Sequence, residues 1–177
     1  MNKIAIAALL TAFVAAPAVA ADSYGNAYVG IKVGQAKTNF DNISLTKDSP
    51  MAYGIFGGSQ FNKNFAVEAE YTDLGKGEFA GGEAKSSAWG LSVVGSVPIG
   101  NNFSLYGKLG VARANTDASG SASAKHTGAT YGLGGNFDVS PSVGLRLSYE
   151  RYNLGDSAAT FPSGKADVLA LGAVLKF

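Results

Sequence analysis

The stretch NFAVEAEYTDLG, from Asn64 to Gly75, decides the fold, because its side chains change character at every step. Apolar residues occupy alternate positions, with two glutamates between them: Phe65, Val67, Ala69 and Tyr71, then Glu68 and Glu70. Alternation with a period of two predicts a β-strand with one apolar face and one polar face. The rest of the chain decides whether the polar face meets water outside the protein or lines a closed interior.

The first residues have the arrangement of a secretory signal peptide. Lys3 gives a positive start, Ile4–Ala16 is apolar and uncharged, and Ala18-Val19-Ala20 forms a small-residue cleavage site. The apolar run is too short for a comfortable membrane span of ~20 residues. We therefore expect residues 1–20 to be a signal peptide and residues 21–177 to form a single exported domain.

Composition excludes several kinds of chemistry. Loss of Lys3 with the signal peptide leaves 13 basic residues (14 − 1) and 13 acidic residues, so the net charge is zero. A neutral chain argues against nucleic acid as a partner. The chain has no cysteine and one histidine, which cannot build a zinc site, and we expect no cofactor. Mean hydropathy is +0.10, and no mature segment is apolar enough to span a membrane as a helix.

Alternating runs fill the mature chain, each roughly 9 to 12 residues long, close to the ~9–11 residues that a tilted strand needs to cross a membrane. We expect strands near residues 27–36, 51–61, 64–75, 87–97, 103–113, 127–137, 143–152 and 167–177. In the 51–61 run, Tyr53 and Ile55 oppose Gly54 and Gly58, although Phe56 breaks the pattern.

The connectors between these runs alternate in length. Short ones lie near residues 62–64, 98–102 and 138–142, and long polar ones near residues 37–50, 72–86, 115–126 and 153–165. Short turns at one end and long loops at the other are typical of a bacterial transmembrane barrel, with the short turns in the periplasm. The sequence therefore predicts an all-β fold, an eight-stranded antiparallel up-and-down β-barrel in the outer membrane, with its apolar face against lipid.

Charged side chains are expected inside this barrel. Counting alternate positions places seven of them on the inner face: Lys32, Glu68, Glu70, Lys108, Arg146, Glu150 and Lys176. An eight-stranded barrel is narrow and its interior is about filled by side chains. A buried carboxylate costs several kcal/mol unless it is paired, so we expect these acids and bases to form an ion-pair network.

The chain resembles the eight-stranded membrane barrel of the outer membrane protein A family. The resemblance covers the whole mature chain and rests on five stretches: YVGIKVG (28–34), GIFGGSQFNKNFAVEAEYTDLG (54–75), LYGKLGVARANTD (105–117), VGLRLSYE (143–150) and LGAVLKF (171–177). Full-length members of that family add a periplasmic domain that binds peptidoglycan. This chain ends at the expected last strand, so we do not expect it to anchor the cell wall.

The resemblance implies roles for particular residues. In that family a glutamate on the third strand pairs with an arginine on the seventh, and Glu68 and Arg146 match these positions. The family's second interior pair falls on Val94 and Asn136, so that pair is expected to be missing and the interior to depend on the first pair more heavily than in the family. Glu70 is expected nearer the loops and water.

The last residue, Phe177, has two compatible interpretations. The resemblance implies that a terminal aromatic residue is read by the outer-membrane assembly machinery. An aromatic side chain at this position also fits the girdle at the lower membrane interface.

Four functions are compatible with this fold. The first is a structural protein that supports the envelope and displays its loops, and the second an adhesin-like module whose loops bind a surface ligand through residues such as Phe79, Trp89 and Phe161. The third is a narrow pore, which the missing second pair favours. The fourth is a lipid-modifying enzyme, which would pair His126 with Ser121 or Ser123 in a loop that holds catalytic geometry poorly. We expect a structural or surface-interaction role without catalysis.

Overall fold

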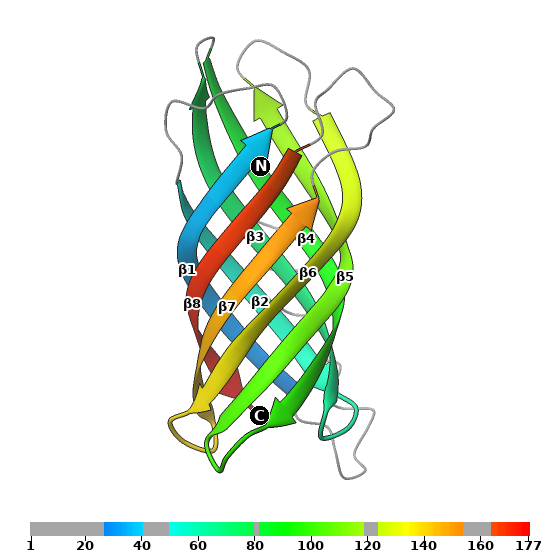
Figure 1. Ribbon diagram of the computed structural model, residues 1–177, viewed down its shortest axis with the longest axis vertical. Coiled ribbons are helices and arrows are strands. Elements are labelled where there is room, and N and C mark those ends of the chain that lie inside the picture. The colour runs from blue at the N-terminus through cyan, green and yellow to red at the C-terminus, as the bar shows by residue number, and fades with distance from the viewer. Residues whose placement is uncertain (1–26, 41–49, 80–81, 119–123, 154–163) are drawn as a thin grey trace.

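The computed structural model describes residues 27–40, 50–79, 82–118, 124–153 and 164–177, and the predicted signal peptide lies outside them. The strands are β1 (Ala27–Phe40), β2 (Met51–Gln60), β3 (Phe65–Phe79), β4 (Gly82–Pro98), β5 (Phe103–Ala118), β6 (Ala124–Asp138), β7 (Val143–Asn153) and β8 (Gly164–Lys176). They form one closed barrel in chain order (Figure 1). The predicted fold class is confirmed.

Closure of the barrel depends on antiparallel pairing between the first and last strands. Ile31 of β1 pairs with Ile55 of β2 on one side and with Ala173 of β8 on the other. A closed sheet has no free edge, so its backbone groups are paired within the barrel even where lipid surrounds it. Within the described ranges, no helix has the length and apolarity to cross a membrane.

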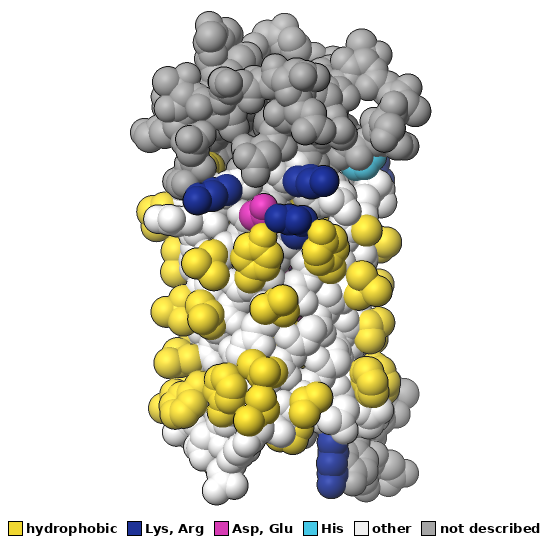
Figure 2. Space-filling model, viewed as in Figure 1, with side chains coloured by type: hydrophobic (Ala, Val, Ile, Leu, Met, Phe, Trp, Pro, Cys, Tyr) yellow, Lys and Arg dark blue, Asp and Glu magenta, His cyan; other side chains and the backbone are white. Residues whose placement is uncertain are grey.

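The outer wall carries the large apolar side chains. On β7, Leu145 and Leu147 are 44% and 55% exposed, whereas Arg146 and Ser148 between them are 7% and 2% exposed. The same alternation runs around the barrel, and Figure 2 shows apolar side chains distributed over the visible wall. Such a surface would be unfavourable in water, and it matches the apolar band of an outer-membrane barrel.

Phe56, which breaks the sequence pattern of β2, belongs to the inner face. It is 4% exposed, whereas Tyr53 on the outer face is 54% exposed. The strand therefore alternates regularly, with an aromatic side chain in the interior where the pattern suggested only small residues.

Two hairpins are longer at the loop end than the sequence predicts. β3 and β4 continue to pair as far as Phe79 opposite Gly82, past an irregularity between Asp73 and Lys76. Gly75 lies at this irregularity with φ +80°, a conformation that favours glycine. In Figure 1 this hairpin rises farthest above the ends of β1, β7 and β8.

The β5–β6 hairpin is extended in the same way. It pairs as far as Thr116 opposite Ala124, so His126, expected in a loop, lies in β6 opposite Ala114. The local cause is continued backbone pairing, which a polar, serine-rich sequence does not reveal.

The turns at the opposite end are short, as predicted. Between β2 and β3, the Asn62 side-chain oxygen accepts hydrogen bonds from the backbone N–H groups of Asn64 at 2.9 Å and Phe65 at 2.8 Å. An asparagine that bonds the backbone two and three residues ahead is a common way to stabilise a tight turn.

Candidate functional site: the charged barrel interior

Six charged side chains meet inside the barrel, and each residue is between 2% and 7% exposed. They come from four strands: Lys32 on β1, Glu68 and Glu70 on β3, Lys108 on β5, and Arg146 and Glu150 on β7. We call them the interior charge cluster. Three are cations and three are anions, so the cluster is neutral as a whole.

One part of the cluster is a ring of two carboxylates and two ammonium groups. Glu70 Oε2 accepts hydrogen bonds from Lys32 Nζ at 2.8 Å and Lys108 Nζ at 2.6 Å. Glu150 bridges the same two lysines from the other side, at 2.5 Å from Lys32 and 3.0 Å from Lys108. Each charge in the ring therefore has two partners of opposite sign, which offsets the cost of its burial.

Tyr152 completes this ring. Its hydroxyl lies 3.0 Å from Glu70 Oε1 and 2.6 Å from Glu150 Oε2, and can donate its proton to either one. The residue is 1% exposed and sits among small apolar side chains on the loop side of the cluster. Tyr152 thus covers the ring on its loop side, and its own hydroxyl is hydrogen-bonded.

The other part of the cluster is centred on Arg146. Its Nη1 donates to Glu68 Oε2 at 2.5 Å, and its Nε donates to Asn136 Oδ1 at 2.8 Å. Tyr28 donates its hydroxyl proton to the same Glu68 oxygen at 2.8 Å. Lys108 Nζ lies 3.7 Å from Glu68 Oε1 and connects this part with the ring.

Three aromatic rings surround the Arg146 guanidinium. Its central carbon is 5.3 Å, 4.5 Å and 4.8 Å from the ring centroids of Tyr28, Phe56 and Tyr106. Cation–π attraction adds to the ion pair in such a desolvated place. Alternation in the sequence places Tyr28 on the face of Lys32 and Tyr106 on the face of Lys108, but it does not show that these two rings and Phe56 surround Arg146.

Lys176, expected in the interior network, is not part of it. It lies at the end of β8, where its Nζ is 2.6 Å from Asp138 Oδ1 and both side chains are about one third exposed (34% and 36%). Alternation gives the correct face, but the strand end places this ammonium group where water reaches it.

The interior contains more ion pairs than Glu68–Arg146. Val94 and Asn136 carry no charge, but Lys32 and Lys108 supply the second set of ion pairs from β1 and β5. Glu70 is not near water either, because β3 continues to Phe79 and the residue is 3% exposed.

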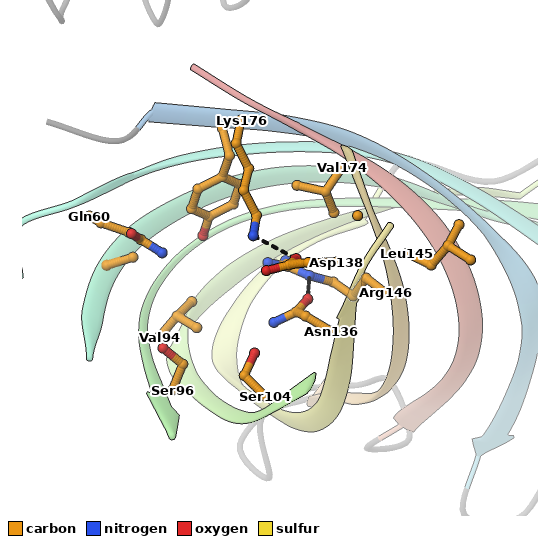
Figure 3. A pocket seen from close by; sticks show the side chains of 13 residues that line it. Gln60, Val94, Ser96, Ser104, Asn136, Asp138, Leu145, Arg146, Val174 and Lys176 are labelled. Atoms are coloured by element: carbon orange, nitrogen blue, oxygen red, sulfur yellow. Dashed lines mark hydrogen bonds and ion pairs between the residues drawn. The ribbon is translucent and has the colours of Figure 1, made fainter. Parts of the chain in front are cut away.

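A small cavity lined by both polar and apolar side chains lies below the cluster, toward the short turns. Its volume is about 60 Å³, and it is bounded by the Arg146 side chain. Figure 3 shows Arg146 held against Asn136 and Lys176 held against Asp138 in its wall. The cavity is a short vestibule that ends at the interior charge cluster.

The described residues offer little for catalysis. They include no group of three or more histidine, cysteine or acidic side chains that could hold a metal ion. Ser121 and Ser123, the nucleophiles considered for His126, lie outside the described residues. The acidic side chains of the cluster are all engaged by cations, an arrangement that suits structure rather than proton transfer.

Fold and interior together define a transmembrane β-barrel whose interior holds paired charged side chains. The outer membrane protein beta-barrel domain family matches residues 6–177, and the chain belongs to this family. Outer membrane protein P5 of Haemophilus influenzae is 34% identical over 179 residues, covering 85% of this chain and 51% of that protein. The chain thus spans about half the length of the curated relatives it matches.

Solved structures share the fold. Ail of Yersinia pestis, in complex with the heparin analogue sucrose octasulfate, has a TM-score of 0.63 and 22% identity over 88% of this chain and 100% of that one. Neisserial surface protein A has a TM-score of 0.62 and 20% identity over 85% of this chain and 97% of that one. The protein lies in the lipid bilayer of the outer membrane, as the sequence predicts.

Glu68→Ala and Arg146→Ala should each destabilise the protein by roughly 3–5 kcal/mol, because each leaves an unpaired charge in the interior. The double variant should lose less than the sum of the two, since it restores neutrality. The free energy of unfolding in lipid vesicles, measured by urea titration, tests this. Lys176→Ala, which breaks a part-exposed pair, is the control and should cost about 1 kcal/mol or less. Additive losses would show that the two side chains are not coupled.

Proposed function

We propose that this protein is a non-catalytic outer-membrane barrel with a closed lumen, which supports the envelope and displays its loop-end hairpins at the cell surface. The observation that carries this proposal is the neutral interior charge cluster. The side chains of Lys32, Glu70 and Lys108 are 4%, 2% and 0% exposed, so they fill the lumen rather than line a channel.

The contacts within the cluster favour a plug over a pore. Ions would have to break the ring around Glu70 and also displace Arg146 from Glu68 and its aromatic neighbours. The vestibule of about 60 Å³ reaches only the lower side of this barrier. A narrow pore is the alternative that a conductance measurement decides.

Lys108→Ala should make the non-conducting barrel conduct cations selectively. Lys108 contacts all three acids of the cluster, and its loss leaves a net charge of −1 in the lumen. Planar-bilayer recordings in a KCl gradient measure both the current and its reversal potential. The wild type and Lys176→Ala should show no steady current, with folding verified by the heat-dependent shift in gel mobility. Steady current through the wild type would overturn the closed-lumen proposal.

The extended hairpins support a second role, as a surface-binding module. The β3–β4 pairing continues past Gly75 to Phe79, and strands that project beyond the apolar band expose their ends to solvent. Among structures with this fold, Ail was solved with a heparin analogue, which makes a sulfated glycan a reasonable first probe for this chain.

Replacing residues 78–83 with an Asn-Gly turn shortens the β3–β4 hairpin without touching the barrel wall. If the hairpin binds, cells with this variant should lose at least tenfold in retention on heparin beads. If the role is structural, the same variant should still restore resistance to dye leakage in a deletion strain. Unchanged retention would remove the β3–β4 hairpin from the binding proposal, and failure to restore resistance would argue against a support role independent of the hairpin.

Phe177 is the residue we propose for assembly. Its side chain is 71% exposed at the end of β8, and its backbone N–H bonds to the Ala27 carbonyl at 2.8 Å. Little of its apolar surface is buried within the barrel, so a role outside the folded protein accounts for it better than internal packing does.

Deleting Phe177 should lower the amount of folded protein in the outer membrane several-fold while leaving refolding into detergent nearly unchanged. Quantitative immunoblots of membrane fractions and gel-shift refolding assays provide the two measurements. Phe177→Tyr keeps the aromatic ring and should behave like the wild type. An equal loss in both assays would make Phe177 a stability residue instead of an assembly signal.

A further inference from the structure

A second group of charged residues lies on the outside of the barrel, at the loop end of β1, β7 and β8. It consists of Lys37, Arg151, Lys165 and Asp167, which we call the basic rim. Lys37 and Arg151 flank Asp167 in one row, as its direct partners on the two neighbouring strands. Figure 2 shows basic side chains around an acidic one just above the upper apolar side chains.

The Arg151 guanidinium is held in a fixed orientation. Its Nε lies 2.5 Å from Asp167 Oδ1 and its Nη2 lies 2.9 Å from Asp167 Oδ2, a bidentate arrangement. Nη2 also donates to the Tyr149 hydroxyl at 3.1 Å. This bidentate pair fixes both side chains, and because the two charges offset each other, the net positive charge of the rim comes from its lysines.

The two lysines of the rim give it an excess of positive charge. Lys37 and Lys165 are exposed, and in the described part of the chain neither ammonium group forms an ion pair. Three cations and one anion leave a net charge of +2. This differs from the interior charge cluster, where cations and anions are equal in number.

One row below the rim, Leu169 on β8 pairs with Gln35 on β1 and with Tyr149 on β7. Gln35 is exposed, and Leu169 and Tyr149 are 57% and 37% exposed. The next row down is apolar, with Val33 and Leu171 43% and 55% exposed. Tyrosines commonly mark the level at which a membrane's apolar layer meets its polar headgroups. A lipid whose acyl chains lie on these apolar side chains would place its headgroup at the basic rim.

We propose that the basic rim binds the phosphate of a phosphorylated glycolipid in the outer leaflet, with the acyl chains on the apolar side chains below. The long loops place this end of the barrel at the cell surface, where the outer leaflet is. Ammonium groups near a membrane surface attract anionic headgroups, and each contributes about fivefold to affinity. The apolar side chains below the rim, Leu169 and Leu171 on β8 and Val33 on β1, favour a lipid over a soluble anion, which would make no use of them.

The test compares binding of a bis-phosphorylated glycolipid with binding of its dephosphorylated form, with the same acyl chains, to the full chain in detergent micelles. Native mass spectrometry measures the retained lipid during titration. The wild type should prefer the phosphorylated form by at least tenfold. Lys37→Gln with Lys165→Gln should weaken binding by about twenty-five-fold, the product of two fivefold effects.

Lys63→Gln is the matched control, because Lys63 is exposed in the turn between β2 and β3 at the opposite end of the barrel. It should bind within twofold of the wild type. Equal retention of the dephosphorylated glycolipid, or undiminished binding by the double variant, would overturn the proposal. Displacement of the lipid by millimolar inorganic phosphate would also overturn it, since the rim would then bind free anions.

Discussion

Lipid offers no hydrogen-bond partners to a polypeptide backbone, and this constraint underlies the whole structure. Every N–H and C=O at membrane depth must be paired within the chain, which a sheet achieves only by closing on itself. Pairing of β1 with β8 provides that closure. With eight strands the lumen is narrow and is about filled by side chains. Charges on the inner face therefore cannot rely on water, and they must neutralise one another.

Glycines make the space for this neutralisation. A Cβ atom at Gly54 would come within 2.7 Å of Lys32 Cε, and one at Gly134 within 2.7 Å of the Tyr106 ring. Any larger residue at these two positions would therefore collide with the Lys32 side chain or with the Tyr106 ring, which packs on Arg146. Glycines on the inner face therefore leave room for the long charged side chains that project from other strands. The glycines and the interior charge cluster depend on each other.

Alternation along the chain was enough to predict the eight strands, the lipid-facing wall and the inner position of all six cluster residues. It could not predict partners, because these depend on distances across the lumen between strands far apart in sequence. The ring formed by Lys32, Glu70, Lys108 and Glu150 was missed for this reason. Strand ends were also missed, since the hairpins continue through polar residues by backbone pairing alone. Because of that error, Glu70 was expected near water although it is buried. Lys176 shows that alternation predicts whether a side chain faces inward, but not how far it lies from the end of the barrel.

The neutrality of the interior has a consequence for how the barrel responds to an electric field. A single charge carried across a membrane potential changes in energy by about 2.3 kcal/mol per 100 mV. The interior charge cluster has three positive and three negative groups, so a displacement of the cluster as a unit moves no net charge. A potential across the outer membrane therefore exerts no net force on the interior charge cluster as a whole.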